Sequence, residues 1–116
     1  MKPNNIILDK SYAFALKIVQ LHMHLTKECN EYILSKQLLR SGTSIGANVE
    51  EAIGGISRKD FRAKMSIAYK EARETHYWLR LLIDSKVLTS ELGSPIKNDC
   101  EENRKILSSI LKTLNS

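Results

Sequence analysis

The chain has 116 residues, of which 42% are hydrophobic and 27% are charged, and its formal net charge is +5. This length suits one domain with one core, and the composition lies in the ordinary globular range. No run approaches the ~18 consecutive apolar residues of a membrane span. We therefore expect one cytoplasmic domain over residues 1–116, with no signal peptide at Met1–Asn5 and with reduced thiols at Cys29 and Cys100.

Five glycines and two prolines favour long helices over a many-stranded sheet. The first helix is expected from Asp9 to Lys27, with Asp9 or Ser11 as its cap. The second is expected to start near Glu31 with Asn30 as its cap. It should end at Gly54-Gly55, where glycine can adopt the left-handed geometry of a helix stop.

The third helix is expected to open at Ser57 and to reach about Lys86, because Ser57 with Asp60 resembles a capping box. The fourth is expected to begin at Ser94-Pro95, a serine cap followed by proline at the first helical position, and to continue to about Leu114. Short connections make sequential helices antiparallel. The sequence therefore predicts an all-α, antiparallel up-down-up-down four-helix bundle.

Apolar residues on the last three helices follow the alternating spacing of four and three that is typical of a bundle core. The expected core positions are Leu34, Leu38, Ile45, Val49, Ala52, Ile56, Phe61, Met65, Ala68, Ala72, Leu79, Ile83, Ile96, Cys100, Leu107, Ile110 and Leu114, with Asn103 in the same series.

The first helix carries two apolar stripes that lie roughly opposite each other, at about 100° per residue. One consists of Phe14, Ile18, Leu21 and Leu25, and the other of Tyr12, Leu16, Val19 and Met23. One core can bury only one stripe, so we expect the second to form an oligomer interface. The alternatives are that this helix sits deep in the bundle, or that the N-terminal segment covers the stripe.

A polar stripe runs along the second helix beside two helix-weakening glycines, Gly42 and Gly46. Small residues there allow another backbone to approach closely. The stripe and its expected partners on the third helix, with Arg40 pairing the carboxylates, form a structural polar seam of Gln37, Arg40, Ser41, Ser44, Asn48, Glu51, Glu71 and Glu74. The alternative is a ligand or phosphate site, but the segment lacks the ending of a phosphate-binding loop.

No constellation for catalysis or metal binding emerges from the sequence. His22 and His24 are two residues apart on a helix and point to roughly opposite sides. Glu74 and His76 have the wrong spacing for a di-iron bundle, which needs paired Glu-x-x-His motifs. We therefore expect no enzyme activity, no metal and no cofactor.

Residues 58–88 contain eight basic and four acidic residues, a net charge of +4. The candidate nucleic-acid-binding residues on this helix are Arg58, Lys59, Arg62, Tyr69, Lys70, Arg73, Tyr77 and Arg80. Arginine binds phosphate well, and tyrosine can stack on a base. The alternative is a solvated face with intrahelical ion pairs such as Lys70–Glu74.

Three segments, Leu34–Ala52, Ser57–Phe61 and Met65–Ala72, resemble bacterial four-helix-bundle proteins named for open reading frames in 23S rRNA intervening sequences. The resemblance covers nearly the whole chain and implies a homopentamer. It also implies a distant relation to the accessory variability proteins of diversity-generating retroelements, which bind nucleic acid and a reverse transcriptase. Glu50 stands where many members of the family have a basic residue, which predicts weaker binding there.

Two functional hypotheses follow. The first is a homo-oligomer that binds RNA or single-stranded DNA through the basic face of the third helix. The second is a structural or adaptor oligomer that binds another protein and has no nucleic-acid role. Neither hypothesis involves a membrane.

Overall fold

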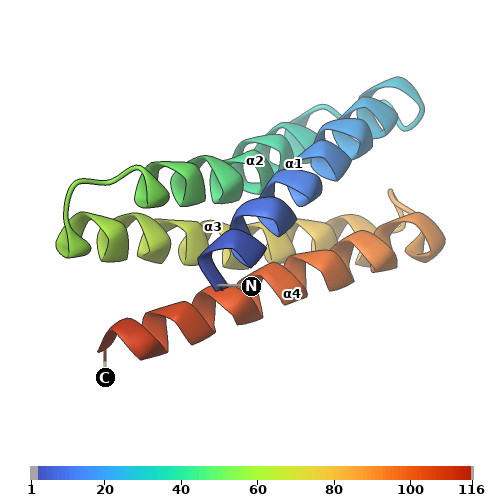
Figure 1. Cartoon of the computed structure of the whole chain (residues 1–116). Coiled ribbons are helices and arrows are strands. Elements are labelled where there is room, and N and C mark those ends of the chain that lie inside the picture. Colours follow the sequence, from blue (N-terminus) through green and yellow to red (C-terminus); the bar gives the residue numbers. More distant parts are fainter. Residues whose placement is uncertain (1–2, 116) are drawn as a thin grey trace.

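The computed structural model describes residues 3–115, with side chains from residue 6 onward. These residues form four helices and no strand: α1 (Pro3–Lys27), α2 (Ile33–Ile53), α3 (Arg58–Asp84) and α4 (Ser90–Asn115). Each helix contacts the next along the chain, and α1 also contacts α4, which closes the bundle (Figure 1). The predicted all-α, up-down-up-down four-helix architecture is confirmed.

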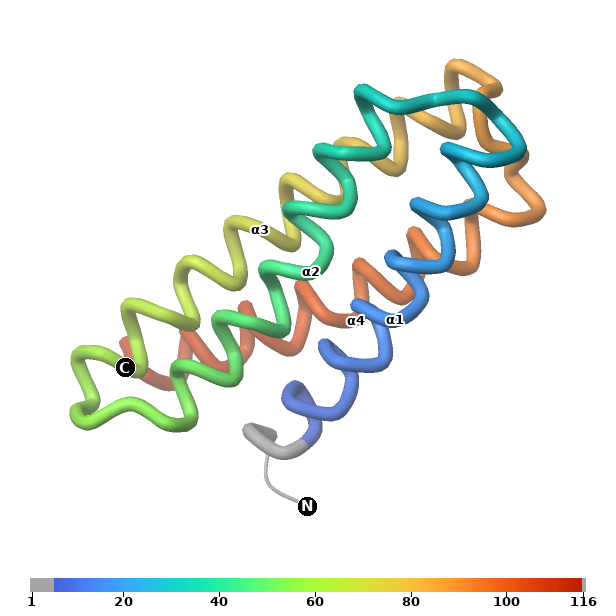
Figure 2. The backbone as a smooth tube through the Cα atoms, turned by 90° about the horizontal axis from the view of Figure 1, so that it is seen from above, coloured from blue at the N-terminus to red at the C-terminus, as the bar shows by residue number. Residues whose placement is uncertain are grey.

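The bundle is elongated, with extents of 43 × 21 × 20 Å. The α1–α2 and α3–α4 connections lie at one end, and the α2–α3 loop lies at the other with the C-terminus (Figure 1). Helices α2 and α3 run side by side, whereas α1 is inclined across α4 (Figure 2). The alternative that the N-terminal segment covers the second stripe of α1 falls in part on Met1 and Lys2, which lie outside the described residues.

Helix α1 begins at Pro3, six residues before the predicted start. Neither expected cap acts as one: Asp9 is exposed within the helix, and Ser11 is buried and donates its hydroxyl to the Leu8 carbonyl. The fully buried side chain of Ile7 explains the longer helix, because the added turn contributes to the core. Proline also suits the first position of a helix, where its missing N–H costs nothing.

Helix α2 begins at Ile33 rather than near Glu31, and Asn30 does not cap it. Asn30 has a φ of 53°, the left-handed geometry of the preceding turn. The Glu31 carboxylate accepts the backbone N–H groups of Leu34 and Ser35 instead. At the other end the helix stops before Gly54, whose φ of −82° is not left-handed, so the predicted glycine geometry was wrong.

The predicted start of the fourth helix was also wrong, because α4 begins at Ser90 and contains Pro95. Thr89 accepts the Leu92 N–H through its hydroxyl. Buried Gly93 lets this turn lie against the end of α3: a Cβ there would come within 2.7 Å of Ile83. Tertiary packing thus extends the helix beyond the local Ser-Pro signal, while the Ser57 cap of α3 forms as predicted.

The core contains one stripe of α1 together with most of the predicted positions of the other helices. One expectation fails there, since Ile56 is 99% exposed in the α2–α3 loop, and the fully buried Leu82 was not among the expected positions. The expected positions that are only partly buried but pack against the core are Leu34, Phe61, Ile83, Ile96 and Leu114. The predicted close approach at the glycines occurs, since a Cβ would lie 2.9 Å from Ile18 at Gly42 and 3.2 Å from the Ser11 backbone at Gly46.

The polar seam fixes α2 against α3 through four cross-helix contacts. The Thr75 hydroxyl donates to the buried Ser41 hydroxyl at 2.9 Å. The Arg40 guanidinium donates to Glu71 at 2.9 Å and to Glu74, the predicted partners. Lys64 pairs with Glu51 at 3.0 Å.

The remaining members of the seam bond within α2, which differs from the prediction. Asn48 donates its side-chain amide to the Ser44 carbonyl at 2.8 Å, and Gln37 accepts from Arg40 at 3.5 Å. The seam is therefore a helix–helix contact centred on Arg40 rather than a continuous polar channel.

The Glu74 carboxylate also accepts the indole N–H of Trp78 at 2.9 Å. This hydrogen bond, followed by those from Arg40, holds the pKa of Glu74 below its usual range. A depressed carboxylate pKa contributes stability above the unfolded-state pKa, and that stability is lost as the pH falls through the folded-state pKa.

Because Trp78 is the only tryptophan, its fluorescence should report the protonation of Glu74. We expect the acid-side change in emission to have its midpoint below pH 4.5, the ordinary value for the carboxyl group. Arg40→Gln should raise this midpoint by removing the guanidinium, whereas Arg58→Gln, an equal charge change distant in sequence, should not. A wild-type midpoint at or above pH 4.5 would contradict the assignment.

Candidate functional site

The outer face of α3 presents most of the predicted nucleic-acid-binding set to solvent. Tyr69 is partly buried, and the exposed members are Arg58, Lys59, Arg62, Lys70, Arg73, Tyr77 and Arg80. The alternative Lys70–Glu74 ion pair does not form, because Glu74 is bound by Arg40 and Trp78. None of the six cations on this face pairs with a carboxylate of residues 6–115, which leaves their charge uncompensated.

Part of this face forms one wall of a groove of about 390 Å³ between α3 and α4. The lining residues are Tyr69, Arg73, His76 and Arg80 from α3, with Glu101 and Arg104 from α4. Positions 69, 73, 76 and 80 recur at spacings of four, three and four, so they share one side of the helix. The groove therefore collects three guanidinium groups around a single carboxylate.

That carboxylate, Glu101, accepts two hydrogen bonds from Arg104, at 2.8 Å from Nε and 3.1 Å from the terminal nitrogen. The Arg104 hydrogen bond is the main cause of the lowered pKa of Glu101. His76 lies with Nε2 3.7 Å from Glu101. Its pKa is lowered chiefly by burial and further by the neighbouring cations, so the imidazole is mostly neutral at pH 7.

The predicted members that do not line the groove are Arg58, Lys59, Arg62, Lys70 and Tyr77. Arg62 donates to the Leu114 carbonyl at 2.9 Å, near the C-terminus of α4. The Arg80 guanidinium stacks over the Tyr77 ring at 5.8 Å from its centroid, and the Trp78 ring meets Tyr77 edge-on at 5.1 Å. Arg80 thus links the groove to an exposed aromatic surface.

Sequence reasoning missed three groove residues, His76, Glu101 and Arg104. Arg104 enters the groove because the buried Cys100 thiol donates to the Ala72 carbonyl at 3.3 Å, which places this part of α4 opposite the middle of α3. No sequence pattern fixes that register. His76 shares its helix side with Arg73 and Arg80, a spacing that was available as a signal.

The second stripe of α1 is exposed along its length. Tyr12, Leu16, Val19 and Met23 are each between 41 and 62% exposed, while the opposite stripe is buried. Helix α1 therefore does not sit deep, which removes one of the two alternatives to an oligomer interface.

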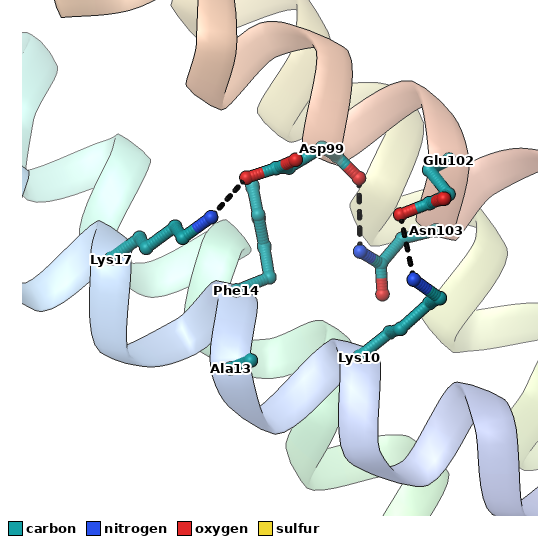
Figure 3. Close-up of a pocket in the computed structure, with 7 residues that line it drawn as sticks. All are labelled: Lys10, Ala13, Phe14, Lys17, Asp99, Glu102 and Asn103. Carbon is teal, nitrogen blue, oxygen red and sulfur yellow. Dashed lines mark hydrogen bonds and ion pairs between the residues drawn. The ribbon is translucent and has the colours of Figure 1, made fainter.

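A smaller cleft of about 130 Å³ lies between α1 and α4 (Figure 3). Two ion pairs cross it, Lys17–Asp99 and Lys10–Glu102, the latter at 3.0 Å. Asn103 donates its amide to the Asp99 carbonyl, and its buried Oδ1 has no hydrogen-bond partner among the described residues. The two pairs neutralise the cleft, in contrast to the arginine groove.

The two thiols lie in different surroundings: Cys29 Sγ is 3.7 Å from His24 Nε2, whereas Cys100 is buried. Both cysteines are free, and burial raises the pKa of Cys100 to about 12. Within the described residues no group of His, Cys, Asp and Glu is arranged to hold a metal ion. None of their helices is long and apolar enough to cross a membrane.

Comparisons with known proteins agree with the fold. A solved structure similar to this chain is that of a protein of unknown function from the S23 ribosomal protein family of Bacteroides thetaiotaomicron. The two chains are 50% identical, the match covers 96% of this chain and 99% of the other, and the TM-score is 0.93. No curated protein matches this sequence.

The sequence pattern of one family matches residues 3–109. The match spans all of α1, α2 and α3 and most of α4. This chain belongs to the family of 23S rRNA-intervening sequence proteins.

Proposed function

We propose that this protein is a non-enzymatic homo-oligomer that binds RNA or single-stranded DNA along the outer face of α3. The observation that carries the proposal is the convergence of Arg73, Arg80 and Arg104 in the α3–α4 groove around one carboxylate, Glu101. A surplus of guanidinium groups at one place suits phosphate, which arginine binds through two parallel N–H donors.

The aromatic groups beside these arginines favour single strands over duplexes. Tyr77 is 47% exposed and is stacked with Arg80, so an unpaired base can extend the stack. Bases in a duplex are not exposed for such stacking. Phosphate contacts carry no sequence information, so binding is expected to depend little on sequence.

Self-association is the second part of the proposal. The exposed stripe of α1 offers four apolar side chains in a row, and a second copy of the chain would bury them. The family resemblance described above implies five subunits. Each added subunit repeats the basic face of α3, which multiplies the phosphate contacts available to one strand.

An adaptor role is the alternative, supported by exposed apolar residues outside α1. Ile33 at the start of α2 is 78% exposed, and Ile56 in the α2–α3 loop is 99% exposed. Ile33 follows the α1–α2 connection and Ile56 lies in the α2–α3 loop, segments at opposite ends of the bundle where a protein partner could contact them (Figure 1).

Light scattering tests the assembly. The wild-type protein should have a mass several times the 13.2 kDa of one chain. Leu16→Glu should dissociate it, because the interface would bury an unpaired charge. Ser109→Glu adds the same charge at an exposed position of α4 and should leave the assembly intact. A wild-type monomer at micromolar concentration would refute self-association.

Nucleic-acid binding is tested by fluorescence anisotropy with a labelled single-stranded RNA at about 50 mM salt, where electrostatic binding is strong. The double variant Arg73→Gln/Arg80→Gln should bind more weakly, and its log–log salt slope should flatten by about 0.7 for each phosphate that is no longer neutralised. Lys27→Gln/Lys36→Gln removes the same charge from exposed positions elsewhere and should bind nearly as tightly as the wild type.

Two results would count against the proposal. Absence of wild-type binding to RNA and to single-stranded DNA at this salt would remove the nucleic-acid role and leave the adaptor role. Equal weakening by the two double variants would show that net charge, rather than the face of α3, governs binding.

A further inference from the structure

The groove between α3 and α4 has a charge that distinguishes two kinds of phosphate. Three guanidinium groups and one carboxylate line it, a surplus of two positive charges while His76 is neutral. An internal phosphodiester carries one negative charge. A terminal phosphate monoester carries about −1.5 to −2 at pH 7 and has three acceptor oxygens, so it matches the surplus more closely.

The donors of the groove are available for such a group. Arg73 and Arg80 form no hydrogen bond with the described residues, and no carboxylate neutralises them. Arg104 uses two of its five N–H groups on Glu101 and also interacts with Tyr69 on the α3 wall, which fixes the guanidinium plane and still leaves donors for a ligand. Glu101 thereby orients Arg104 without occupying its free edge.

His76 occupies the middle of the α3 wall, between Arg73 and Arg80 in the sequence. The groups that face it are Glu101 and Arg104 from α4, with Lys97 nearby and Arg80 from its own helix. A dianion placed here would favour the protonated imidazole, which would then become a further donor. Protonation of His76 would thus add one positive charge to the groove when a dianion is bound.

We propose that this groove binds a phosphate monoester at the end of a single-stranded nucleic acid, with Arg73, Arg80 and Arg104 as its ligands. The strand then leaves the groove past Arg80 and the exposed Tyr77 ring. This inference rests on the proposed nucleic-acid role and narrows it to strand ends that carry a phosphate.

The test is a competition experiment at pH 7.5 with one labelled single-stranded RNA as the probe. The competitors are unlabelled 12-mers of one sequence with a 5′-phosphate, with a 3′-phosphate or with hydroxyl groups at both ends, together with AMP. At least one phosphorylated 12-mer should compete on the order of tenfold better than the hydroxyl-ended 12-mer, as expected for one added charge-assisted contact. AMP should compete more weakly than that 12-mer, because it lacks the rest of the strand.

Variants of the groove test whether it is the source of the preference for the phosphorylated 12-mer. Arg104→Gln should reduce the ratio of the affinities for the phosphorylated and the hydroxyl-ended 12-mer towards one, because the end phosphate loses a ligand. Arg73→Gln alters the opposite wall, breaks no ion pair and should also reduce this ratio, so it provides the test if Arg104→Gln impairs folding. Arg58→Gln, an equal charge change outside the groove, should weaken both 12-mers alike and keep the ratio.

Equal competition by all three 12-mers would overturn the end-specific site while leaving the proposed function intact. The absence of binding by any strand would overturn both proposals. An AMP affinity equal to that of the phosphorylated 12-mer would reassign the groove to free nucleotides. If both groove variants kept the preference for the phosphorylated 12-mer, the end phosphate would have to bind outside the groove, which would overturn the proposal.

Discussion

The contact of Arg40 with Glu71 and Glu74 connects the fold of this protein to its surface charge. It joins α2 to α3 beside the buried hydroxyl pair of Ser41 and Thr75. It also directs both carboxylates towards α2, away from the outer face of α3. Because Glu71 and Glu74 are held in the helix–helix contact, Lys70 and the exposed arginines of α3 have no carboxylate partner among residues 6–115.

The same distribution of charge recurs on α4. Asp99 and Glu102 pair with lysines of α1, so these two carboxylates hold α1 in place and neutralise the α1–α4 cleft (Figure 3). Only Glu101 faces the arginine groove, where Arg104 binds it. Among the described residues the bundle therefore has paired charges on two sides of its core and one groove with surplus positive charge, which is where a phosphate ligand is expected.

The hydrophobic periodicity was sufficient to predict four helices and most of the core. Each helix buries one apolar stripe, and the spacing of that stripe in the sequence indicates both the helix and its core positions. Local signals predicted the helix starts less well. Ser94-Pro95 has the composition of a start, but the packing of Gly93 against Ile83 extends α4 to Ser90. The basic residues of α3 were visible in the sequence, whereas the contribution of Arg104 depends on the register between Cys100 and Ala72, which periodicity does not determine.

Under the proposed function, the outer face of α3 binds nucleic acid only while Arg40 holds Glu71 and Glu74. The direct measurement is the affinity for a single-stranded RNA at low salt of Arg40→Gln and of the triple variant Arg40→Gln/Glu71→Gln/Glu74→Gln, with folding checked by circular dichroism. Arg40→Gln should bind several-fold more weakly, because it frees two carboxylates, and the triple variant should recover wild-type affinity. Wild-type affinity in Arg40→Gln, or a triple variant that stays weak, would contradict the account.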